Sequence, residues 1–378
     1  MTNQSQEASL SRADAVRRAE ALAPALRARG EACERQRRVP DETIADLLAS
    51  KVLRLCQPVR FGGSGLGWDA LCEASIALAR GDGSQAWVAN VYMEHKCLLA
   101  LFGDEAQRDV WDADRDALIA ATIIPAGNSV RRAAGGYVLD GRWGFASGVD
   151  HAAWVILGEM ADDEHLFFLL PTTDYTVIDD WHTLGLAGTG SRTVAVHETF
   201  VPEHRVISNR SVAAGQAPGA ALDDNPLYRM PFLGFAQLAL TSVPLGVALG
   251  MVDDFAKQLR NPSDSMLTRM AESAAEMRSA ELLLMDTVRS NMAALAEKRA
   301  LGEVDAGRSL RDSAYVATLA KRTAARLFEA SGGRGIYLTQ PLQRAFRDVH
   351  AAAVHGSLNW DRNMIRYGRT MAATQGDA

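Results

Sequence analysis

The stretch that decides the fold is "GGYVLDGRWGFASGVDHAAWVILG", residues 135–158. It contains two β-type runs, Tyr137–Leu139 and Trp154–Leu157, separated by fourteen residues rich in glycine, serine and aromatic side chains. A tight hairpin uses only about two to five turn residues. A long aromatic connection inside a compact protein is typical of a functional segment and not of a disordered one. We therefore expect this segment to hold a flat ligand with a polar edge.

The composition of the 378-residue chain is that of a globular protein with two or three structural units around a substantial core. The net charge of −6 argues against nucleic-acid binding, which requires a basic patch. The four cysteines show no CxxC pairing, and no histidines or carboxylates show metal-ligand spacing, so no metal site is expected. The N-terminus lacks the apolar run of a signal peptide. These features predict a cytoplasmic protein, since isolated thiols suit a reducing compartment.

One apolar segment, Phe232–Val252, has 21 residues without a charge and is long enough to cross a membrane. It contains the polar residues Gln237, Thr241 and Ser242, however, and it lacks the flanking anchors of a membrane span. We therefore predict no membrane association. A helix that is apolar on all sides lies centrally in a soluble protein or at a subunit contact. The segment is thus interpreted as a buried helix, and it favours a homo-oligomer.

The chain is predicted to be helical from residue 11 to about 120, where Ser11 and Asp14 form a capping pair and Gly30 ends the first helix. Short strands separated by turn residues follow to about residue 208, and long helices occupy the remainder. The order of helices, strands and helices restricts the choice of fold. The prediction is an α+β protein with an N-terminal helical domain (1–117), a small middle β-barrel or sheet domain (118–210) and a C-terminal four-helix bundle (211–378).

The opening stretch fits the pattern Y-x-L-x-G-x-W-x-F-x-S-G-x-x-H-A-x-W, with Tyr137, Leu139, Gly141, Trp143, Phe145, Ser147, Gly148, His151, Ala152 and Trp154. With this pattern and this order of elements, the chain resembles the acyl-CoA dehydrogenase fold. It is most similar to the flavin-dependent monooxygenase branch, the oxygenase components of two-component hydroxylases acting on 4-hydroxyphenylacetate, 3-hydroxy-seco-steroids and sulfur heterocycles. Three further segments carry the resemblance, at residues 123–129 ("IIPAGNS"), 184–194 ("LGLAGTGSRTV") and 331–361.

The resemblance implies a reaction in which reduced flavin, FMNH2 or FADH2, reacts with O2 to form a C4a-hydroperoxyflavin. This species would hydroxylate an aromatic or other electron-rich small molecule. The reduced flavin would come from a separate NAD(P)H:flavin reductase, and the chain itself has no Rossmann fingerprint for a nicotinamide cofactor. The resemblance also implies a homotetramer or a homodimer.

The residues expected to hold the flavin fall into three groups. Alternation along an extended segment places Trp143, Phe145 and Ser147 on one face. The resemblance implies that the two aromatic rings pack on the isoalloxazine and that the Ser147 hydroxyl meets N5. It also implies that the segment around Ile124, Pro125 and Gly127 follows another edge of the ring, with backbone N–H groups bonded to ring oxygens. The third group is expected to bind a phosphate or the cofactor of a neighbouring subunit, and comprises Arg260, Gly332, Gly333 and Arg334.

The C-terminal segment distinguishes two chemistries. Dehydrogenases of this fold often carry a glutamate base a few residues after an "RD" pair. With Arg347-Asp348 in register, that position is Gly356, preceded by His355. The resemblance implies that His355 deprotonates the substrate or holds the peroxide, and an imidazole with an ordinary pKa of about 6.5 suits either task. By the same resemblance, His95 assists from the substrate side and Ser147 helps to retain the peroxide proton.

Two alternatives stay open at this point. The chain could be an acyl-CoA dehydrogenase or oxidase with tightly bound FAD and a base elsewhere, for which Asp253 and Asp254 are available. It could also be a helical scaffold without a cofactor. Each site residue also has a purely structural interpretation: aromatic residues such as Trp143 often belong to a core, and a histidine on an apolar helix, such as His95, is often a hydrogen-bonded core residue.

Overall fold

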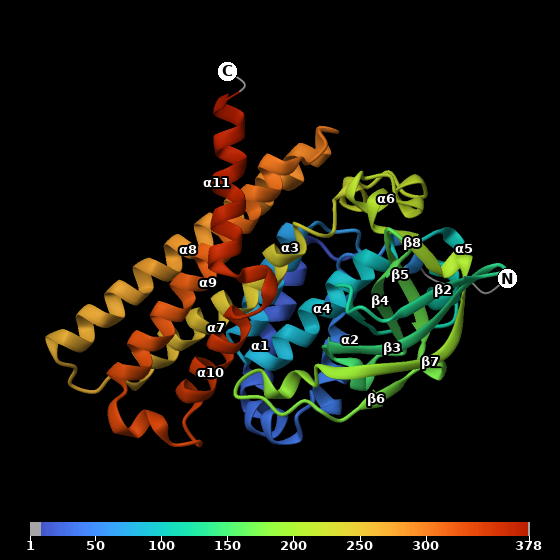
Figure 1. The fold of residues 1–378 in the computed structure, drawn as a ribbon. Coiled ribbons are helices and arrows are strands. Elements are labelled where there is room, and N and C mark those ends of the chain that lie inside the picture. Colours follow the sequence, from blue (N-terminus) through green and yellow to red (C-terminus); the bar gives the residue numbers. More distant parts are fainter. Residues whose placement is uncertain (1–8, 377–378) are drawn as a thin grey trace.

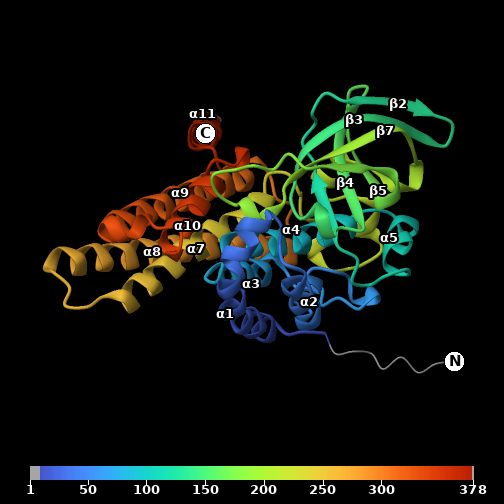
Figure 2. The same cartoon turned by 90° about the horizontal axis from the view of Figure 1, so that it is seen from below.

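The structure is a computed structural model that describes residues 9–376, with side chains as far as residue 373. Along the sequence, helices precede and follow one group of strands (Figure 1). The sheets lie to one side of the molecule, and the long C-terminal helices extend away from them in both views (Figure 2). The predicted α+β arrangement of helices, a small β-domain and a helical bundle is therefore confirmed. Helices give way to strands between Trp111 and Ile119, and the last strand ends at Ser208.

The N-terminal helices begin with the predicted capping box between Ser11 and Asp14. The predicted end at Gly30 is wrong, because the first helix continues to Gln36. Gly30 lies inside this helix, where an added Cβ would be 2.5 Å from the Asp82 carboxylate and 2.6 Å from the Arg344 guanidinium. The glycine therefore permits close approach to a buried charge cluster. The helices are α1 (Arg12–Gln36), α2 (Asp41–Ser50), α3 (Trp68–Ala79), α4 (Gly83–Leu99) and α5 (Asp104–Trp111).

The middle region contains two four-stranded sheets with the orders β1-β4-β5-β8 and β2-β3-β7-β6. Apolar residues such as Leu139, Leu157 and Phe168 form a separate core in this region. The strands are β1 (Ile119–Thr122), β2 (Ser129–Ala133), β3 (Gly136–Ala146), β4 (Trp154–Ala161), β5 (Glu164–Pro171), β6 (Thr176–Ile178), β7 (Arg192–Pro202) and β8 (Val206–Ser208).

The predicted fourteen-residue connection in the opening stretch is wrong. Strand β3 extends to Ala146, so only residues 147–153 connect it to β4, and the two strands belong to different sheets. Strand β3 remains paired with β7 despite two irregularities in register. At the second, Trp143 faces Val194 and Ala146 faces Arg192, so β3 contains one extra residue. This β-bulge changes the side-chain alternation just before Ser147.

The C-terminal helices are arranged around α7, which contacts both the N-terminal helices α3 and α4 and the C-terminal helices α9 and α10. Helix α7 is the one described helix that is long and apolar enough to cross a membrane, and 78% of its most apolar window is buried in the chain. The predicted buried helix is thus confirmed. Because its own chain covers it, α7 gives no support to the predicted homo-oligomer. The helices are α7 (Ala236–Gln258), α8 (Asp264–Ala296), α9 (Glu303–Ala330), α10 (Pro341–Ala353) and α11 (Trp360–Gly376).

Candidate active site

Ser147, the first residue after β3, is the centre of a hydrogen-bonded group. Its Oγ lies 2.7 Å from the Ser191 Oγ, which lies 2.7 Å from the Thr189 Oγ1. The indole N–H of Trp87 donates to the same Ser147 Oγ over 3.1 Å. All four side chains are buried, so this group has the fixed geometry of a core network, although Ser147 adjoins the surface residue Phe145.

Trp87 connects Ser147 to His355. It lies in the second turn of α4, which begins at the capping carboxylate of Asp82. The His355 ring follows the end of α10 and packs against the Trp87 indole, with ring centroids 5.8 Å apart and an angle of 57° between the planes. The structure therefore places a hydroxyl and an imidazole against one indole, although they are far apart in the sequence.

His355 is held as a neutral imidazole. Its Nδ1 lies 2.7 Å from the Ser357 Oγ, and the tautomer with the proton on Nδ1 donates to that oxygen and leaves Nε2 to accept a proton. Burial by the surrounding protein atoms, together with the positive charge of Arg362, lowers the pKa of His355 below its ordinary value. Solvent still reaches the residue in the single chain. An uncharged, accessible imidazole is able to accept a proton at neutral pH.

Phe145 has an unusual conformation and position. Its φ of 65° lies in the left-handed region, and its side chain is 75% exposed. The ring contacts Trp181 edge to face at 5.9 Å. A strained backbone that presents a large aromatic ring to solvent is typical of a ligand-binding position. The bulge in β3 causes this, since regular alternation would have directed Phe145 differently.

Trp143 does not join Phe145. Its side chain is fully buried in the core of the β-domain, where its Nε1 donates to the Gly158 carbonyl over 3.1 Å. The prediction that Trp143 packs on the flavin ring is therefore wrong, because the ring has no exposed face to offer. Regular alternation failed at the bulge between Trp143 and Ala146.

The segment "IIPAGNS" uses its backbone differently from the prediction. The amides of Ala126, Gly127 and Asn128 donate to the buried carboxylate of Glu159 over 3.0–3.2 Å. The prediction that the Gly127 N–H binds a ring oxygen is therefore wrong, because this N–H already donates to Glu159. Ile124 is 64% exposed and the adjacent Pro125 is partly exposed, so these two remain available to contact a ligand.

His95 lies further along α4 and is buried. Its Nδ1 donates to the Ile119 carbonyl over 2.8 Å, which leaves Nε2 as an acceptor. Burial lowers the pKa of His95 to about 4, so the imidazole is uncharged at neutral pH. This contact attaches α4 to β1, the strand that leads towards Ile124. The role of His95 towards a substrate stays a prediction.

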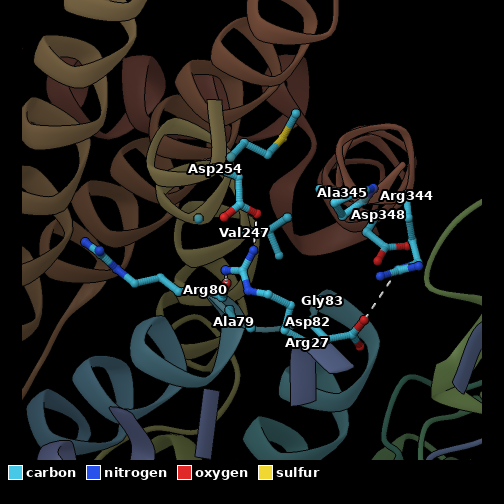
Figure 3. Close-up of a pocket in the computed structure, with 14 residues that line it drawn as sticks. Arg27, Ala79, Arg80, Asp82, Gly83, Val247, Asp254, Arg344, Ala345 and Asp348 are labelled. Atoms are coloured by element: carbon cyan, nitrogen blue, oxygen red, sulfur yellow. Dashed lines mark hydrogen bonds and ion pairs between the residues drawn. The ribbon is translucent and has the colours of Figure 1, made fainter. Parts of the chain in front are cut away.

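A buried charge cluster fixes the segment that carries Thr189 and Ser191. The Asp348 carboxylate of α10 accepts from the Leu186 backbone N–H over 2.7 Å. Figure 3 shows Asp348 beside Arg344, which points towards Asp82 across a small cavity, with 3.6 Å between the Arg344 Nε and the Asp82 Oδ2. Burial and the nearby Asp82 charge raise the pKa of Asp348 to about 7. One cluster thus joins α4, α10 and the hydroxyl-bearing segment.

The third predicted group of cofactor residues is elsewhere. Arg260 is exposed in the connection between α7 and α8, and Gly332, Gly333 and Arg334 are exposed after α9. Both views show these connections at the end of the helical bundle away from the sheets (Figures 1 and 2). The structure does not bring these four residues to Ser147 within one chain. Their expected contact with the cofactor of a neighbouring subunit stays a prediction.

The residues around Ser147 fit the isoalloxazine ring of a flavin, which needs an apolar surface for its flat face and polar partners along its edge. Phe145 offers an exposed apolar ring two residues before Ser147, whose Oγ offers a polar partner, and Ile124 offers a further exposed apolar side chain after β1. Two acyl-CoA dehydrogenase family models match the chain, the N-terminal domain over residues 7–113 and the C-terminal domain over residues 230–360.

Similar proteins define the branch. The oxygenase subunit HsaA, a flavin-dependent monooxygenase of Rhodococcus jostii (strain RHA1), is 32% identical over 370 residues, covering 93% of this chain and 97% of that protein. The chain belongs to the flavin-dependent monooxygenases of the acyl-CoA dehydrogenase fold. The oxygenase component of the FADH2-dependent resorcinol hydroxylase of Rhizobium sp. (strain MTP-10005) is 34% identical, covering 94% and 93% of the two chains.

Solved structures agree with the assignment of this chain to the flavin-dependent monooxygenases. The crystal structure of 3-HSA hydroxylase from Rhodococcus sp. RHA1 has a TM-score of 0.91 and 32% identity, covering 95% of this chain and 97% of that one. XiaF from Streptomyces sp., in complex with FADH2 and glycerol, has a TM-score of 0.88 and 27% identity, covering 96% of both chains. The resemblance to this branch inferred from the sequence is confirmed.

The sequence did not identify four residues of the site in the monooxygenase, namely Trp87, Trp181, Thr189 and Ser191. Thr189 and Ser191 lie within "LGLAGTGSRTV", so the matched segment pointed to their neighbourhood. Trp87 had no signal beyond being one aromatic residue on an apolar helix. Asp348 set the register of the C-terminal comparison, but nothing in the sequence linked it to Leu186.

Asp253 and Asp254, the candidate bases of the alternative dehydrogenase, have structural partners in the monooxygenase. Asp253 forms an ion pair with Arg80 over 2.8 Å, and Asp254 forms one with Arg27. Asp254 borders the cavity in Figure 3, between α7 and α1, and not the Ser147 site. Neither carboxylate supports the alternative.

Replacing Phe145 with glycine is expected to separate stability from flavin binding in the monooxygenase. Glycine adopts a φ of 65° without steric cost, so the free energy of unfolding should stay constant or rise by about 1 kcal/mol. Loss of the exposed ring should weaken reduced-flavin binding by ~10-fold, the worth of an aromatic contact. Denaturant unfolding and anaerobic flavin titration measure the two effects. Phe145→Ala is the matched control, since it removes the ring but keeps the strain; a glycine variant that binds flavin like the wild type would contradict the assignment.

Proposed function

We propose that this monooxygenase hydroxylates a phenolic or other electron-rich aromatic small molecule, with FADH2 delivered by a separate NAD(P)H:flavin reductase. One observation carries the proposal. The His355 imidazole packs on Trp87, and Trp87 donates its indole N–H to Ser147, beside the exposed Phe145 ring. With Arg347-Asp348 in register, His355 would stand next to the position at which dehydrogenases of this fold have a carboxylate base.

When it is bound, reduced flavin activates O2 and supplies one oxygen atom to the substrate, while the second leaves as water. The residues of this chain would position and protect that chemistry. Phe145 and Ile124 would contact the ring, and Ser147 would fix its N5 edge by a hydrogen bond. His355, uncharged at neutral pH, would accept the phenolic proton and make the aromatic carbon more electron-rich. The buried groups around Trp87 would limit the entry of water.

The preference for FADH2 over FMNH2 is supported by two relatives, a hydroxylase named as FADH2-dependent and XiaF, solved with FADH2. We further propose a cytoplasmic homotetramer. The exposed apolar side chains of Ile336, Tyr337 and Leu338, next to the glycine-rich turn after α9, support a subunit contact. Such a contact would carry Arg334 to the flavin of another subunit. Sedimentation analysis tests the assembly: the wild type should sediment as a tetramer and Leu338→Glu as a smaller species.

The experiment that tests the function compares two reactions under matched conditions. The enzyme is mixed with photoreduced FAD or FMN, oxygen and a panel of phenols, and product and H2O2 are both measured. Hydroxylated product with little H2O2 is expected, with FADH2 more effective than FMNH2. In parallel, the enzyme loaded with oxidised FAD is mixed anaerobically with acyl-CoA esters. Bleaching of the flavin by a thioester, with no phenol hydroxylated, would overturn the proposal in favour of a dehydrogenase.

A further inference from the structure

We propose that the hydroxyl chain Thr189–Ser191–Ser147 has one fixed direction and thereby makes the site select reduced flavin over oxidised flavin. The inference rests on the proposed function, since it concerns the flavin at that site. It adds a determinant of cofactor choice in which Thr189 and Ser191 act through Ser147.

The direction of the hydrogen bonds in the hydroxyl chain is fixed at its Thr189 end. The Thr189 Oγ1 lies 2.8 Å from the Leu186 carbonyl oxygen, the shortest of three donor contacts to that oxygen, since the Thr189 backbone N–H and the Trp181 indole N–H both lie 3.1 Å from it. A carbonyl oxygen is only able to accept, so the single hydroxyl proton of Thr189 points there. Thr189 must then accept the proton of Ser191 across their 2.7 Å contact. The reverse direction would leave two oxygens 2.8 Å apart with no proton between them, which is repulsive.

Counting protons and lone pairs in the same way decides whether the Ser147 hydroxyl donates to a ligand or accepts from it. Since the Ser191 proton points towards Thr189, Ser191 accepts the proton of Ser147 over 2.7 Å. The indole N–H of Trp87 is only able to donate, and it occupies one lone pair of Ser147. Ser147 therefore has no free proton and one free lone pair. Towards a ligand it is an acceptor.

The oxidation state of a flavin changes the chemistry of N5. Reduced flavin carries a hydrogen on N5 and donates, whereas oxidised flavin has a lone pair on N5 and accepts. An acceptor at Ser147 forms a hydrogen bond with reduced flavin and opposes oxidised flavin with a second lone pair. This polarity suits an oxygenase that must capture reduced flavin from a reductase and release the oxidised product.

The Leu186 carbonyl, which fixes the Thr189 end of the hydroxyl chain, is held rigidly. Leu186 has a left-handed backbone with a φ of 51°, its N–H donates to the buried Asp348, and its carbonyl also accepts from the Trp181 indole over 3.1 Å. The preceding Gly185 packs closely on α10, since a side chain there would place its Cβ 2.3 Å from the Arg347 carbonyl oxygen. The Leu186 carbonyl therefore has no freedom to turn away and release Thr189.

The decisive variant is Thr189→Val, which has nearly the same shape and removes the hydroxyl. The Ser191 proton then turns towards Ser147, and Ser147 becomes able to donate to oxidised N5. We expect the ratio of the oxidised-flavin Kd to the reduced-flavin Kd to fall by ~10-fold, the net worth of one hydrogen bond. The measurement is anaerobic titration with photoreduced FAD and separate titration with oxidised FAD. Thr189→Ser keeps the hydroxyl and should keep the wild-type ratio.

Two further variants separate the effect of hydrogen-bond direction in the hydroxyl chain from the effect of altered side-chain packing around Ser147. Ser191→Ala frees the Ser147 proton and should lower the ratio as Thr189→Val does. Trp87→Phe removes a donor without freeing that proton, so it should change both affinities and leave the ratio within ~2-fold. A wild type that prefers reduced FAD, with an unchanged ratio in Thr189→Val and Ser191→Ala, would overturn this inference alone. A wild type that binds no reduced flavin would overturn the proposed function as well.

Discussion

Replacing His355 with alanine is expected to lower the rate of hydroxylation by ~10²-fold or more, the usual contribution of a positioned acid–base group. Reduced-flavin binding should persist, because His355 contacts Trp87 and the flavin-side hydroxyl belongs to Ser147. Rapid mixing of the enzyme–FADH2 complex with oxygen and substrate, with product and H2O2 quantified, measures the effect. Oxygen consumption should continue, with H2O2 in place of product.

The pH dependence gives an independent test of His355. Burial and Arg362 lower its pKa, so the imidazole is uncharged at neutral pH and gains a proton only in the acidic range. Wild-type hydroxylation should therefore fall on acidification, with a midpoint below about 6.5, the ordinary value. The alanine variant should lack this decrease. His197→Ala is the control, because His197 is an exposed residue of β7 that pairs with Asp140. Equal product yields from the two variants would remove the role assigned to His355.

Replacing Arg344 with methionine is expected to lower the free energy of unfolding by about 3–5 kcal/mol, the cost of leaving a buried charge without its partner. Arg344 lies 3.6 Å from the Asp82 carboxylate, and Asp348 is buried beside them (Figure 3). The Arg344 charge opposes the rise in the pKa of both carboxyl groups. Its removal would leave two buried acids that are stable only when protonated.

The loss of unfolding free energy in Arg344→Met should therefore depend on pH. Because burial raises the pKa of Asp348 to about 7, the folded state retains a proton that the unfolded state releases near pH 4. The stability linked to this proton is complete below about pH 4 and is lost as the pH rises towards 7. Without Arg344 the raised pKa moves higher still, so denaturant unfolding at about pH 8 should show a larger loss than at about pH 5.

Two variants control the Arg344 experiment. Arg131→Met removes an exposed ion pair with Glu198 and should cost less than about 1 kcal/mol. Adding Asp348→Asn to Arg344→Met should recover part of the loss, because it removes one buried charge and keeps an oxygen that accepts from Leu186. If Arg344→Met costs no more than Arg131→Met at either pH, the cluster does not stabilise the fold as described.

The sequence by itself determined the succession of helices, strands and helices, the buried α7 and the family. These features depend on local periodicity and on residues spaced within single segments, such as the run from Tyr137 to Trp154. It also indicated Ser147, Phe145 and His355 as neighbours of one flavin. The roles assigned to these side chains remain predictions that the experiments above address.

Only the tertiary structure decided how the site is assembled. The bulge in β3 buries Trp143 and exposes Phe145, and an extra residue in a strand leaves no mark on alternation that a sequence pattern detects. Glu159 occupies the amide of Gly127, and Trp87 joins Ser147 to His355, through contacts between segments distant in the chain. The direction of the hydroxyl chain depends on where the Leu186 carbonyl lies, and long-range packing against α10 sets that position. Periodicity reports which faces are apolar, whereas hydrogen-bond partners across the core follow from three-dimensional proximity alone.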